Sequence, residues 1–375
     1  MRCNIAINSR YVGGVYFNQK IDDPTSTVIT FFNHEALRID SDIAKKIEKS
    51  FFKESFRRVD YSKIGEIYES KHEKEYKKYK EEIESLLKID RLKSSNFRIA
   101  VDMMHGIASE IFPNLLNDLD IDNITFNAHE DSSRLANIKT LSRQSNQDMS
   151  EVIKALKLNA GFILYPYGQR LDIVCDNGYV LNKQASLFVV LRLLDMEAKK
   201  IGIKKRVFLP TWASDIVEFK NVEIERGQYS NFKDKDLRKY DLVATGEGNF
   251  TFTDFATHRD SMYATLKILE MMLTHNIKLS TILSSLPKFY YKTTQIACSQ
   301  ALKGKMMRMF LNDAKDKKSS TLDGVKIWLD KNDWILMIPD LYTDNLNLYI
   351  QAENDSRGEA ILEKYSKKIE KWSKE

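Results

Sequence analysis

The segment FRIAVDMMHGIASEIFPNLL, residues 97–116, begins the pattern that decides the fold. An apolar strand-like stretch leads through a loop into helical spacing, and further strands are predicted at NITFN (123–127) and GFIL (161–164). A second round begins at KRVFLP (205–210) and closes with a helix predicted over 260–274. Alternating strands and helices are typical of α/β layers with largely parallel sheets. The sequence therefore predicts two α/β units.

Shorter patterns lie on either side of these two units. Residues 14–18 and 28–32 are predicted as strands, and a helix is predicted to start at Asp40 or Ser41. Alternating Lys and Glu residues predict a helix with a solvated face over about 70–87. The N-terminal part is thus predicted to be a strand pair with one helix.

The remaining helices and strands follow from the same patterns. Helices are predicted at 107–119, 149–158 and 183–199 in the first unit, and at 212–220 and 232–239 in the second. After residue 287, consecutive strands flanked by helices indicate a smaller α+β domain. Its predicted strands are 288–297, 325–329, 334–338 and 346–352, and its predicted helices are 302–314 and 357–373.

Composition excludes several classes of protein. The 375 residues suit two to four domains, and 43% hydrophobic with 30% charged residues is ordinary for a soluble chain. The formal charge of +5 is a small remainder of interleaved acids and bases, so no nucleic-acid partner is expected. Three distant cysteines indicate a reducing, cytoplasmic location. No apolar run is long enough to span a membrane, so no membrane association is expected.

Four motifs occur in an order that resembles a known superfamily. They are VDMMHG (101–106), LYPYGQRLDIVCDNGYVLN (164–182), ATGEGNFTF with the helix after it (244–270), and LYIQAE (348–353). Together they resemble the phosphohexomutases, the phosphoglucomutase/phosphomannomutase superfamily. The resemblance implies two α/β/α mutase-type domains with mixed, largely parallel sheets, a truncated first domain, and a C-terminal α+β domain.

The resemblance also implies domain boundaries and a fused relative. We expect a remnant of mutase domain I over 1–68, domain II over 69–200, domain III over 201–285 and domain IV over 286–375. The segments 45–67, 303–310 and 321–328 are similar to the degenerate mutase-like C-terminal region of fused mannose-1-phosphate guanylyltransferase/phosphomannomutase proteins. Such a resemblance implies a sugar-1-phosphate nucleotidyltransferase as partner, encoded separately or upstream in a longer gene product.

The chemistry that the superfamily needs is largely missing from the motifs. By alignment with the superfamily, Lys20 stands at the phosphoserine position, and Ser26 is an alternative, displaced nucleophile. Tyr165, Tyr167 and Gln169 stand where the superfamily has three magnesium-binding aspartates. Magnesium prefers hard anionic oxygen ligands, and a tyrosine phenol is neutral at pH 7. No metal cofactor is therefore expected in this loop.

A few motif residues are retained. Arg170 follows the metal-loop position and is a candidate to bind a phosphate, although an ordinary ion pair is the alternative. Gly246 and Glu247 remain from the sugar-reading loop, and Glu247 is either a sugar-hydroxyl acceptor or a solvated glutamate.

Elsewhere the chemistry is lost or absent. In the last domain Ile338 and Asn347 replace phosphate-binding arginines, with acidic residues nearby at 340 and 344. His258-Arg259-Asp260 is interpreted as a helix cap, and the methionines of KGKMMRMF (303–310) as core contacts.

The sequence thus predicts a catalytically inactive mutase-like protein of carbohydrate metabolism. Its expected role is to self-associate, to scaffold a nucleotidyltransferase, or to bind a sugar phosphate. The alternative is an active phosphomannomutase or phosphoglucomutase whose catalytic groups have moved.

Overall fold

The computed structural model describes residues 12–20, 23–56, 58–68, 72–93, 96–228, 234–340 and 343–374. Contacts within the chain form two compact units. The first comprises Met1–Val180, Phe232–Val243 and Asn249–Lys278, and the second comprises Leu181–Asn231, Ala244–Gly248 and Leu279–Glu375. The four predicted domain boundaries stay predictions.

The main sheet of the first unit has the strand order β4-β3-β5-β6. β3 (Arg98–Asp102) runs parallel to β4 (Asp122–Phe126) and to β5 (Ala160–Leu164), whereas β6 (Leu171–Cys175) returns antiparallel to β5. All residues of β5 and β6 are buried, as in strands whose two faces are covered. The predicted α/β layer with a largely parallel sheet is confirmed.

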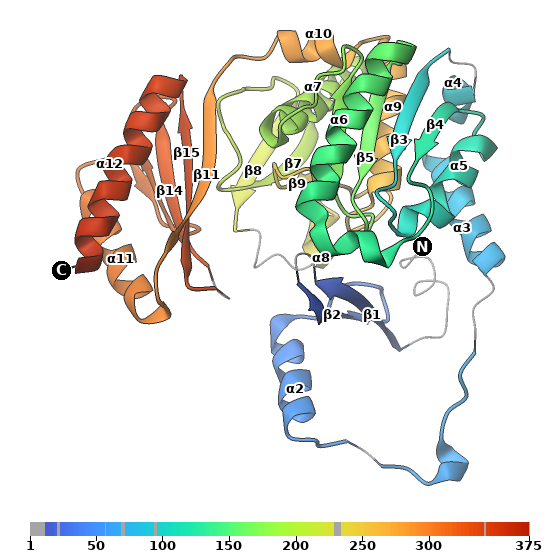
Figure 1. Cartoon of the computed structure of the whole chain (residues 1–375), viewed down its shortest axis with the longest axis horizontal. Coiled ribbons are helices and arrows are strands. Elements are labelled where there is room, and N and C mark those ends of the chain that lie inside the picture. Colours follow the sequence, from blue (N-terminus) through green and yellow to red (C-terminus); the bar gives the residue numbers. More distant parts are fainter. Residues whose placement is uncertain are drawn as a thin grey trace. The chain divides into compact units, whose positions relative to one another are not determined.

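Helices pack on this sheet through apolar residues. α6 (Ile138–Leu156) runs alongside β5 and buries Met149 and Ile153 against the sheet (Figure 1). α9 (Ser261–His275) also contacts β5, and Asp260 caps its first turn by accepting from two backbone N–H groups at 3.0 Å. The predicted cap is confirmed. Further elements of this unit are η1 (Tyr61–Lys63), α3 (His72–Leu86), α4 (Ile89–Lys93), η2 (Ile107–Glu110), α5 (Phe112–Asp118), η3 (Ser132–Asn137) and α8 (Asp234–Leu237).

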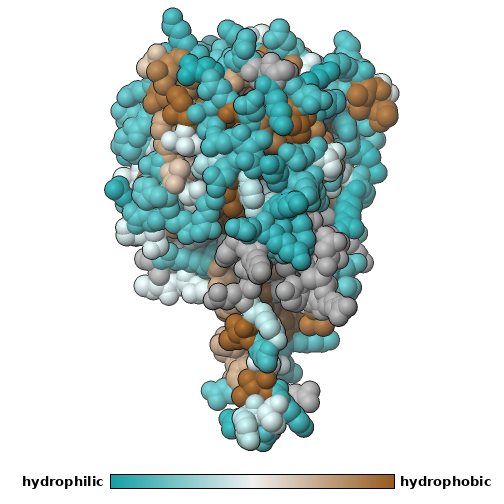
Figure 2. Space-filling model, turned by 90° about the vertical axis from the view of Figure 1, so that its right-hand side faces the viewer, coloured by the Kyte–Doolittle hydropathy of each residue, from teal (hydrophilic) through white to brown (hydrophobic). Residues whose placement is uncertain are grey.

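A small separate sheet stands at the start of the described chain. β1 (Gly13–Lys20) pairs antiparallel with β2 (Asp23–Asn33), and α2 (Ser41–Phe52) follows. The predicted strand pair and helix are confirmed. Several large apolar side chains here are exposed, and Figure 2 shows apolar surface in brown. A two-stranded sheet alone is marginally stable, so this segment contributes little core.

The second unit contains the strands of the second α/β round. β7 (Lys205–Pro210) and β8 (Val222–Gly227) run parallel in a sheet of order β10-β9-β7-β8, in which β9 is Leu242–Ala244 and β10 is Phe250–Phe252. The long helix α7 (Lys183–Ile201) is capped by Asn182, whose side chain accepts from Ala185 N–H at 2.8 Å.

The C-terminal part of the second unit is a five-stranded antiparallel sheet. Its order is β11-β15-β14-β13-β12, and α11 and α12 lie together beside it (Figure 1). Met306 and Phe310 of α11 and Tyr365 of α12 pack against the buried strand residues, which confirms the predicted core methionines and the α+β domain. The bounds are α10 (Leu279–Ser284), β11 (Tyr290–Ala297), α11 (Gln300–Asp313), β12 (Ser319–Ser320), β13 (Val325–Trp328), β14 (Trp334–Pro339), β15 (Asn345–Ala352) and α12 (Asp355–Lys374).

Some predicted helices are wrong or inexact. The helix predicted over 212–220 is absent, and these residues form a turn and a loop. The reason is that side chains satisfy the backbone there: Arg226 donates to the carbonyls of Ala213 and Ser214, and Tyr291 donates to the carbonyl of Trp212. The predicted 107–119 helix is divided into η2 and α5, and α6 starts at Ile138 instead of 149. Residues 232 and 233 of the predicted 232–239 helix lie outside the described residues, and α8 covers Asp234–Leu237.

Candidate functional site

The loop that joins β5 to β6 in the first unit is a tight turn. Tyr165 N–H donates to the carbonyl of Arg170 at 3.0 Å, and Gly168 N–H donates to the carbonyl of Tyr165 at 2.8 Å. Gly168 has φ +63°, a conformation that glycine adopts without strain. Its carbonyl accepts from Ser261 N–H, the first residue of α9, at 2.9 Å. The loop is thus held rigidly at the carboxyl end of β5, where functional residues of parallel sheets gather.

The neighbouring turn after β3 packs tightly against this loop. Ile107 N–H donates to the carbonyl of Pro166 at 2.9 Å, and a Cβ at Gly106 would lie 2.3 Å from the Cα of Pro166. Met104 and His105 have positive φ angles of 44° and 55°. Non-glycine residues rarely adopt such angles, and they gather where a site is constrained. The motifs VDMMHG and YPYGQR are therefore brought together.

Tyr165 faces the protein interior. Its side chain is 8% exposed, its hydroxyl donates to Asp172 at 3.2 Å, and it also contacts the Ser142 hydroxyl at 2.8 Å. Burial, with the charge of Asp172, raises the pKa of the Tyr165 phenol. The phenol is therefore neutral and bonded at neutral pH, and it offers no anionic oxygen to a metal.

The other two metal-loop positions also do not fit magnesium. Tyr167 donates its hydroxyl to the carbonyl of Gln19 at 2.6 Å, and burial raises its pKa. Gln169 is exposed and carries only a neutral amide. Among the described residues, no three His, Cys, Asp or Glu side chains are grouped so as to hold a metal ion. The residues at this loop do not fit the superfamily's magnesium ion.

Arg170 is the one cation of the loop. Its guanidinium lies over the ring of Tyr165, with Cζ 4.5 Å from the ring centroid. Its Nε is buried without a hydrogen-bond partner, and no described carboxylate pairs with it. An arginine oriented by an aromatic face with an unused donor has the form of an anion-binding group. The predicted alternative of an ordinary ion pair finds no described partner.

The predicted phosphoserine position lies at the end of β1. Lys20 pairs with Asp23 at a register irregularity of the β1–β2 hairpin, but its side chain lies outside the described part of the chain. Ser26, the alternative nucleophile, is half-buried on β2. Neither residue is joined by a described general base, so nothing here identifies a nucleophile.

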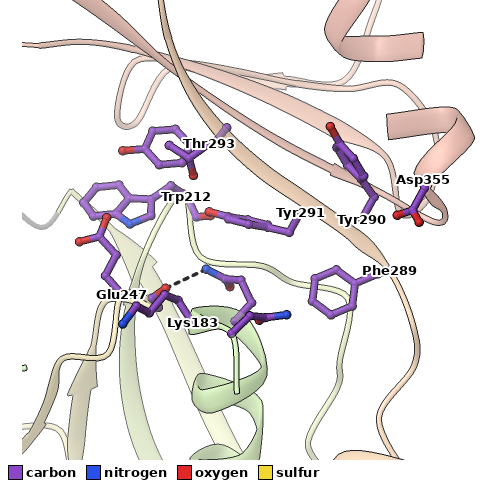
Figure 3. Close-up of a pocket in the computed structure, with 12 residues that line it drawn as sticks. Lys183, Trp212, Glu247, Phe289, Tyr290, Tyr291, Thr293 and Asp355 are labelled. Atoms are coloured by element: carbon purple, nitrogen blue, oxygen red, sulfur yellow. Dashed lines mark hydrogen bonds between the residues drawn. The ribbon is translucent and has the colours of Figure 1, made fainter. Parts of the chain in front are cut away.

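The second unit contains a pocket of its own. Its volume is about 410 Å³, within the range of small-molecule sites. Figure 3 shows Tyr291 between Trp212 and Tyr290, with Glu247 and Lys183 across from it. The pocket is lined by Asn182, Lys183, Gln184, Trp212, Gly246, Glu247, Phe289, Tyr290, Tyr291, Thr293, Tyr349 and Asp355.

The loop after β9 places two predicted residues in this pocket. Gly246 has φ +71°, and its carbonyl accepts from the Gln184 amide at 3.0 Å. A Cβ at Gly246 would lie 2.8 Å from that amide nitrogen, so the close approach requires glycine. Glu247 is exposed, and no described donor bonds or pairs with its carboxylate. Gly246 and Glu247 therefore belong to the second unit, whereas Arg170 belongs to the first.

The third predicted ligand loop, between β14 and β15, contains no arginine. Ile338 and Asn347 are paired in register, and Asn347 accepts from Gln295 at 2.9 Å. Lys303 donates to the backbone carbonyl of Asp340 and to that of Thr343 instead of facing a ligand. Residues 341 and 342 lie outside the described residues. The described part of this loop offers no phosphate clamp.

Sequence reasoning missed most of the pocket and a buried polar cluster beside it. The aromatic lining residues Trp212 and Tyr291 come from segments predicted as a helix and a plain strand. In the cluster, Asp215 binds Lys326 at 3.2 Å and the Trp334 indole N–H at 2.7 Å. A signal was present in PTWASD (210–215), where tryptophan and aspartate directly follow a buried strand.

Comparisons with known sequences agree with this geometry. Residues 77–178 match the family described as phosphoglucomutase/phosphomannomutase, alpha/beta/alpha domain II. The chain is 24% identical to a phosphoglucosamine mutase of Methanocaldococcus jannaschii, over 96% of this chain and 81% of the relative. It is 23% identical to a phosphoglucomutase/phosphomannomutase of Thermococcus kodakarensis, over 94% of this chain and 77% of the relative.

A comparison with solved structures shows the same fold. A phosphoglucomutase/phosphomannomutase family protein of Burkholderia thailandensis superposes with a TM-score of 0.77 at 17% identity. The superposition covers 96% of this chain and 76% of that protein. The predicted α/β mutase fold is thereby confirmed. In the described residues, no helix is both long and apolar enough to cross a membrane.

Proposed function

Given a chain of the phosphohexomutase superfamily, with a phosphoglucomutase/phosphomannomutase domain II and the mutase fold, we propose a non-catalytic protein of carbohydrate metabolism that binds a sugar phosphate. One observation carries this proposal. The loop from Tyr165 to Arg170 has the position and rigidity of a catalytic metal loop, yet its only charged side chain is an arginine without a described carboxylate partner.

The magnitudes support a lack of mutase turnover. Phosphoryl transfer depends on positioning and on the neutralisation of charge by metal ions and cations. Removing a single such stabilising group typically slows a reaction by about 10² to 10³. This chain lacks the metal ligands of the first unit and the arginine clamp between β14 and β15. A fold is retained without these groups, because the core and the site are separate demands on a sequence.

Arg170 is proposed to bind the phosphate. The guanidinium presents donors in a planar fork that matches phosphate oxygens, and the Tyr165 ring fixes its plane. Hydrogen bonds to charged groups are worth about 1.5–3 kcal/mol, so we expect Arg170→Met to weaken binding of a hexose 1-phosphate by roughly tenfold or more. Isothermal titration calorimetry measures the change. Arg98→Met is the matched control, because Arg98 is an exposed arginine paired with Asp122.

A mutase assay tests the absence of catalysis. The pure protein is incubated with the 1-phosphates of glucose, mannose and glucosamine, with magnesium and a hexose bisphosphate activator, and the 6-phosphate is measured. We expect no product above a blank without protein. Turnover above the blank would overturn the proposal in favour of an active mutase, which the names of the relatives favour.

The partner is proposed on sequence grounds. The segments 45–67, 303–310 and 321–328 are similar to fused guanylyltransferase/mutase proteins, so a sugar-1-phosphate nucleotidyltransferase is the proposed partner, with self-association as the alternative. Light scattering of the protein alone, and mixed with such an enzyme from the same source, separates the two. A monomer that forms no complex would contradict both.

A further inference from the structure

We infer that the pocket of the second unit binds the ring of a free hexose and disfavours the same sugar when it carries a phosphate. The inference deepens the proposed function and rests on it in one respect, namely that the ligand is a carbohydrate. Arg170 serves an anion in the first unit, whereas this pocket recognises the uncharged ring. Three features of the lining residues carry the inference.

The first feature is a rigid aromatic wall. The Tyr291 hydroxyl donates to the carbonyl of Trp212 at 2.6 Å, and its ring meets the edge of Trp334 at 6.2 Å between centroids. Trp212 in turn donates its indole N–H to the carbonyl of Thr245 at 3.2 Å and stacks on Tyr349 at 5.8 Å. These rings are therefore held in place before a ligand arrives, which lowers the entropic cost of binding.

The second feature is a polar side opposite that wall. Figure 3 shows Glu247 and Lys183 facing the side of the pocket where Tyr291 lies. Glu247 has no described hydrogen-bond or ion-pair partner, and a carboxylate has acceptor sites for two hydroxyl groups. A pyranose ring presents apolar C–H groups on its faces and hydroxyls at its rim. An aromatic wall opposed by charged hydrogen-bonding groups matches that distribution.

The third feature is the charge of the lining. Glu247 and Asp355 are carboxylates, Lys183 is the only cationic lining side chain, and no arginine lines the pocket. The Glu247 charge is also felt by the rings, since it contributes to the raised pKa of Tyr349 after the larger effect of burial. A phosphate group carries about −1.5 to −2 charges at pH 7. The pocket therefore repels a phosphate and accepts an uncharged sugar.

The fixed amide of Gln184 supports the same assignment. Its nitrogen donates to the carbonyl of Gly246 at 3.0 Å, and its oxygen accepts from Ser214 N–H at 3.0 Å. Both ends are thus used to shape the floor of the pocket, and neither is available as a phosphate donor. The groups that remain for a ligand are the aromatic faces and the charged rim.

Ligand-observed NMR and calorimetry test this pocket on the full chain. Glucose, mannose and glucosamine are each compared with their 6-phosphates, with inorganic phosphate and with tetramethylammonium. We expect the free hexoses to bind, the 6-phosphates to bind roughly fivefold more weakly in the Arg170→Met background, and added salt to shrink this difference. Equal or tighter binding of the phosphates there would overturn the inference. Displacement of the sugar by tetramethylammonium would also overturn it, because the pocket would then be a cation cage.

Variants locate the binding. Tyr291→Leu removes the aromatic face and is expected to reduce hexose affinity at least about tenfold. Tyr179→Leu is the control, because Tyr179 is an exposed tyrosine of the first unit, 52% exposed. Glu247→Gln needs no refolding of the core, since Glu247 is exposed; it should weaken hexose binding and reduce the discrimination against 6-phosphates. Unchanged affinity in Glu247→Gln would overturn the inference even if Tyr291→Leu fails to fold.

The outcomes separate this inference from the proposed function. If no free hexose binds while a hexose 1-phosphate still binds through Arg170, the pocket inference fails and the proposed function stands. If mutase turnover is found while Glu247→Gln still weakens free-hexose binding, the proposed function fails and the ring-binding pocket stands.

Discussion

Two polar regions of this chain differ in how their charged groups are satisfied. In the first unit, Arg170 lies on the Tyr165 ring with its Nε buried and unpartnered. In the second unit, the Asp215 carboxylate accepts from Lys326, from the Trp334 indole and from the Gln351 amide. Buried polar groups in proteins are nearly always paired, so a satisfied cluster indicates structure and an unused donor indicates a ligand.

The charges of the second region are strongly coupled. Burial lowers the pKa of Lys326 to about 8, although Asp215 acts in the opposite direction. Burial alone would raise the pKa of Asp215, but Lys326 and Arg226 hold it below its ordinary value. Lys326 also lies 3.7 Å from the centroid of the Trp334 ring. The cluster thus joins the loop after β7 to the sheet of β13, β14 and β15 within the second unit.

The largest expected effect comes from breaking the satisfied cluster. Asp215→Ala leaves Lys326 buried without its carboxylate, and leaves the Trp334 indole and the Gln351 amide without an acceptor. Removing one partner of a buried pair typically costs 3–5 kcal/mol, so we expect the free energy of unfolding to fall by about 3 kcal/mol. Urea unfolding followed by tryptophan fluorescence measures it.

A surface ion pair provides the control for that variant. Asp122 pairs with Arg98 at 2.9 Å, but both side chains are about half exposed. Asp122→Ala should therefore cost less than about 1 kcal/mol. Equal losses in the two variants would contradict the view that the Asp215 cluster is a structural centre of the second unit.

The next largest effect is expected where the loop of the first region is packed. Gly106→Ala places a Cβ within 2.3 Å of the Pro166 backbone, so the loop must move. Overpacking of this kind typically costs about 1–3 kcal/mol, and the shift should also weaken phosphate binding by Arg170. Calorimetric melting and phosphate titration measure the two effects.

Gly304→Ala is the counterpart of this variant. Gly304 lies within α11, and nothing stands within 4 Å of an added Cβ. Alanine stabilises helix interiors relative to glycine by about 1 kcal/mol, so the melting temperature should rise. A Gly106→Ala protein with unchanged stability and phosphate affinity would show that the loop is not fixed by this contact.

A pH effect of about 2 kcal/mol is expected from Lys326. Its folded pKa of about 8 is below the unfolded value of about 10.4, so above pH 8 the unfolded chain binds more protons. Stability attributable to this group should therefore rise with pH between about 8 and 10. Wild type should gain about 2 kcal/mol relative to Lys326→Met between pH 7.5 and pH 9.5. Parallel pH dependences of the two proteins would contradict the lowered pKa.

The two regions also differ in how far the sequence could predict them. Periodic apolar segments predicted β3, β5, β7 and most helices, because burial on both faces is written in local composition. Arg170 and Glu247 were identified because they follow such strands directly. The fate of Trp212 was not predictable, since its loop is shaped by bonds from Arg226 and Tyr291, which are distant in the sequence. Local propensity carries no information about such partners.

The smallest expected effect separates the two roles of Tyr165. Tyr165→Phe removes the hydroxyl that bonds Asp172 and Ser142 but keeps the ring beneath Arg170. We expect a loss of about 1 kcal/mol in the free energy of unfolding and a change of less than about twofold in phosphate affinity. Tyr165→Leu removes the ring as well, so the guanidinium loses its platform and affinity should fall several-fold. Equal phosphate affinities in the Phe and Leu variants would show that the ring does not orient Arg170, and the anion site would then depend on the loop backbone alone.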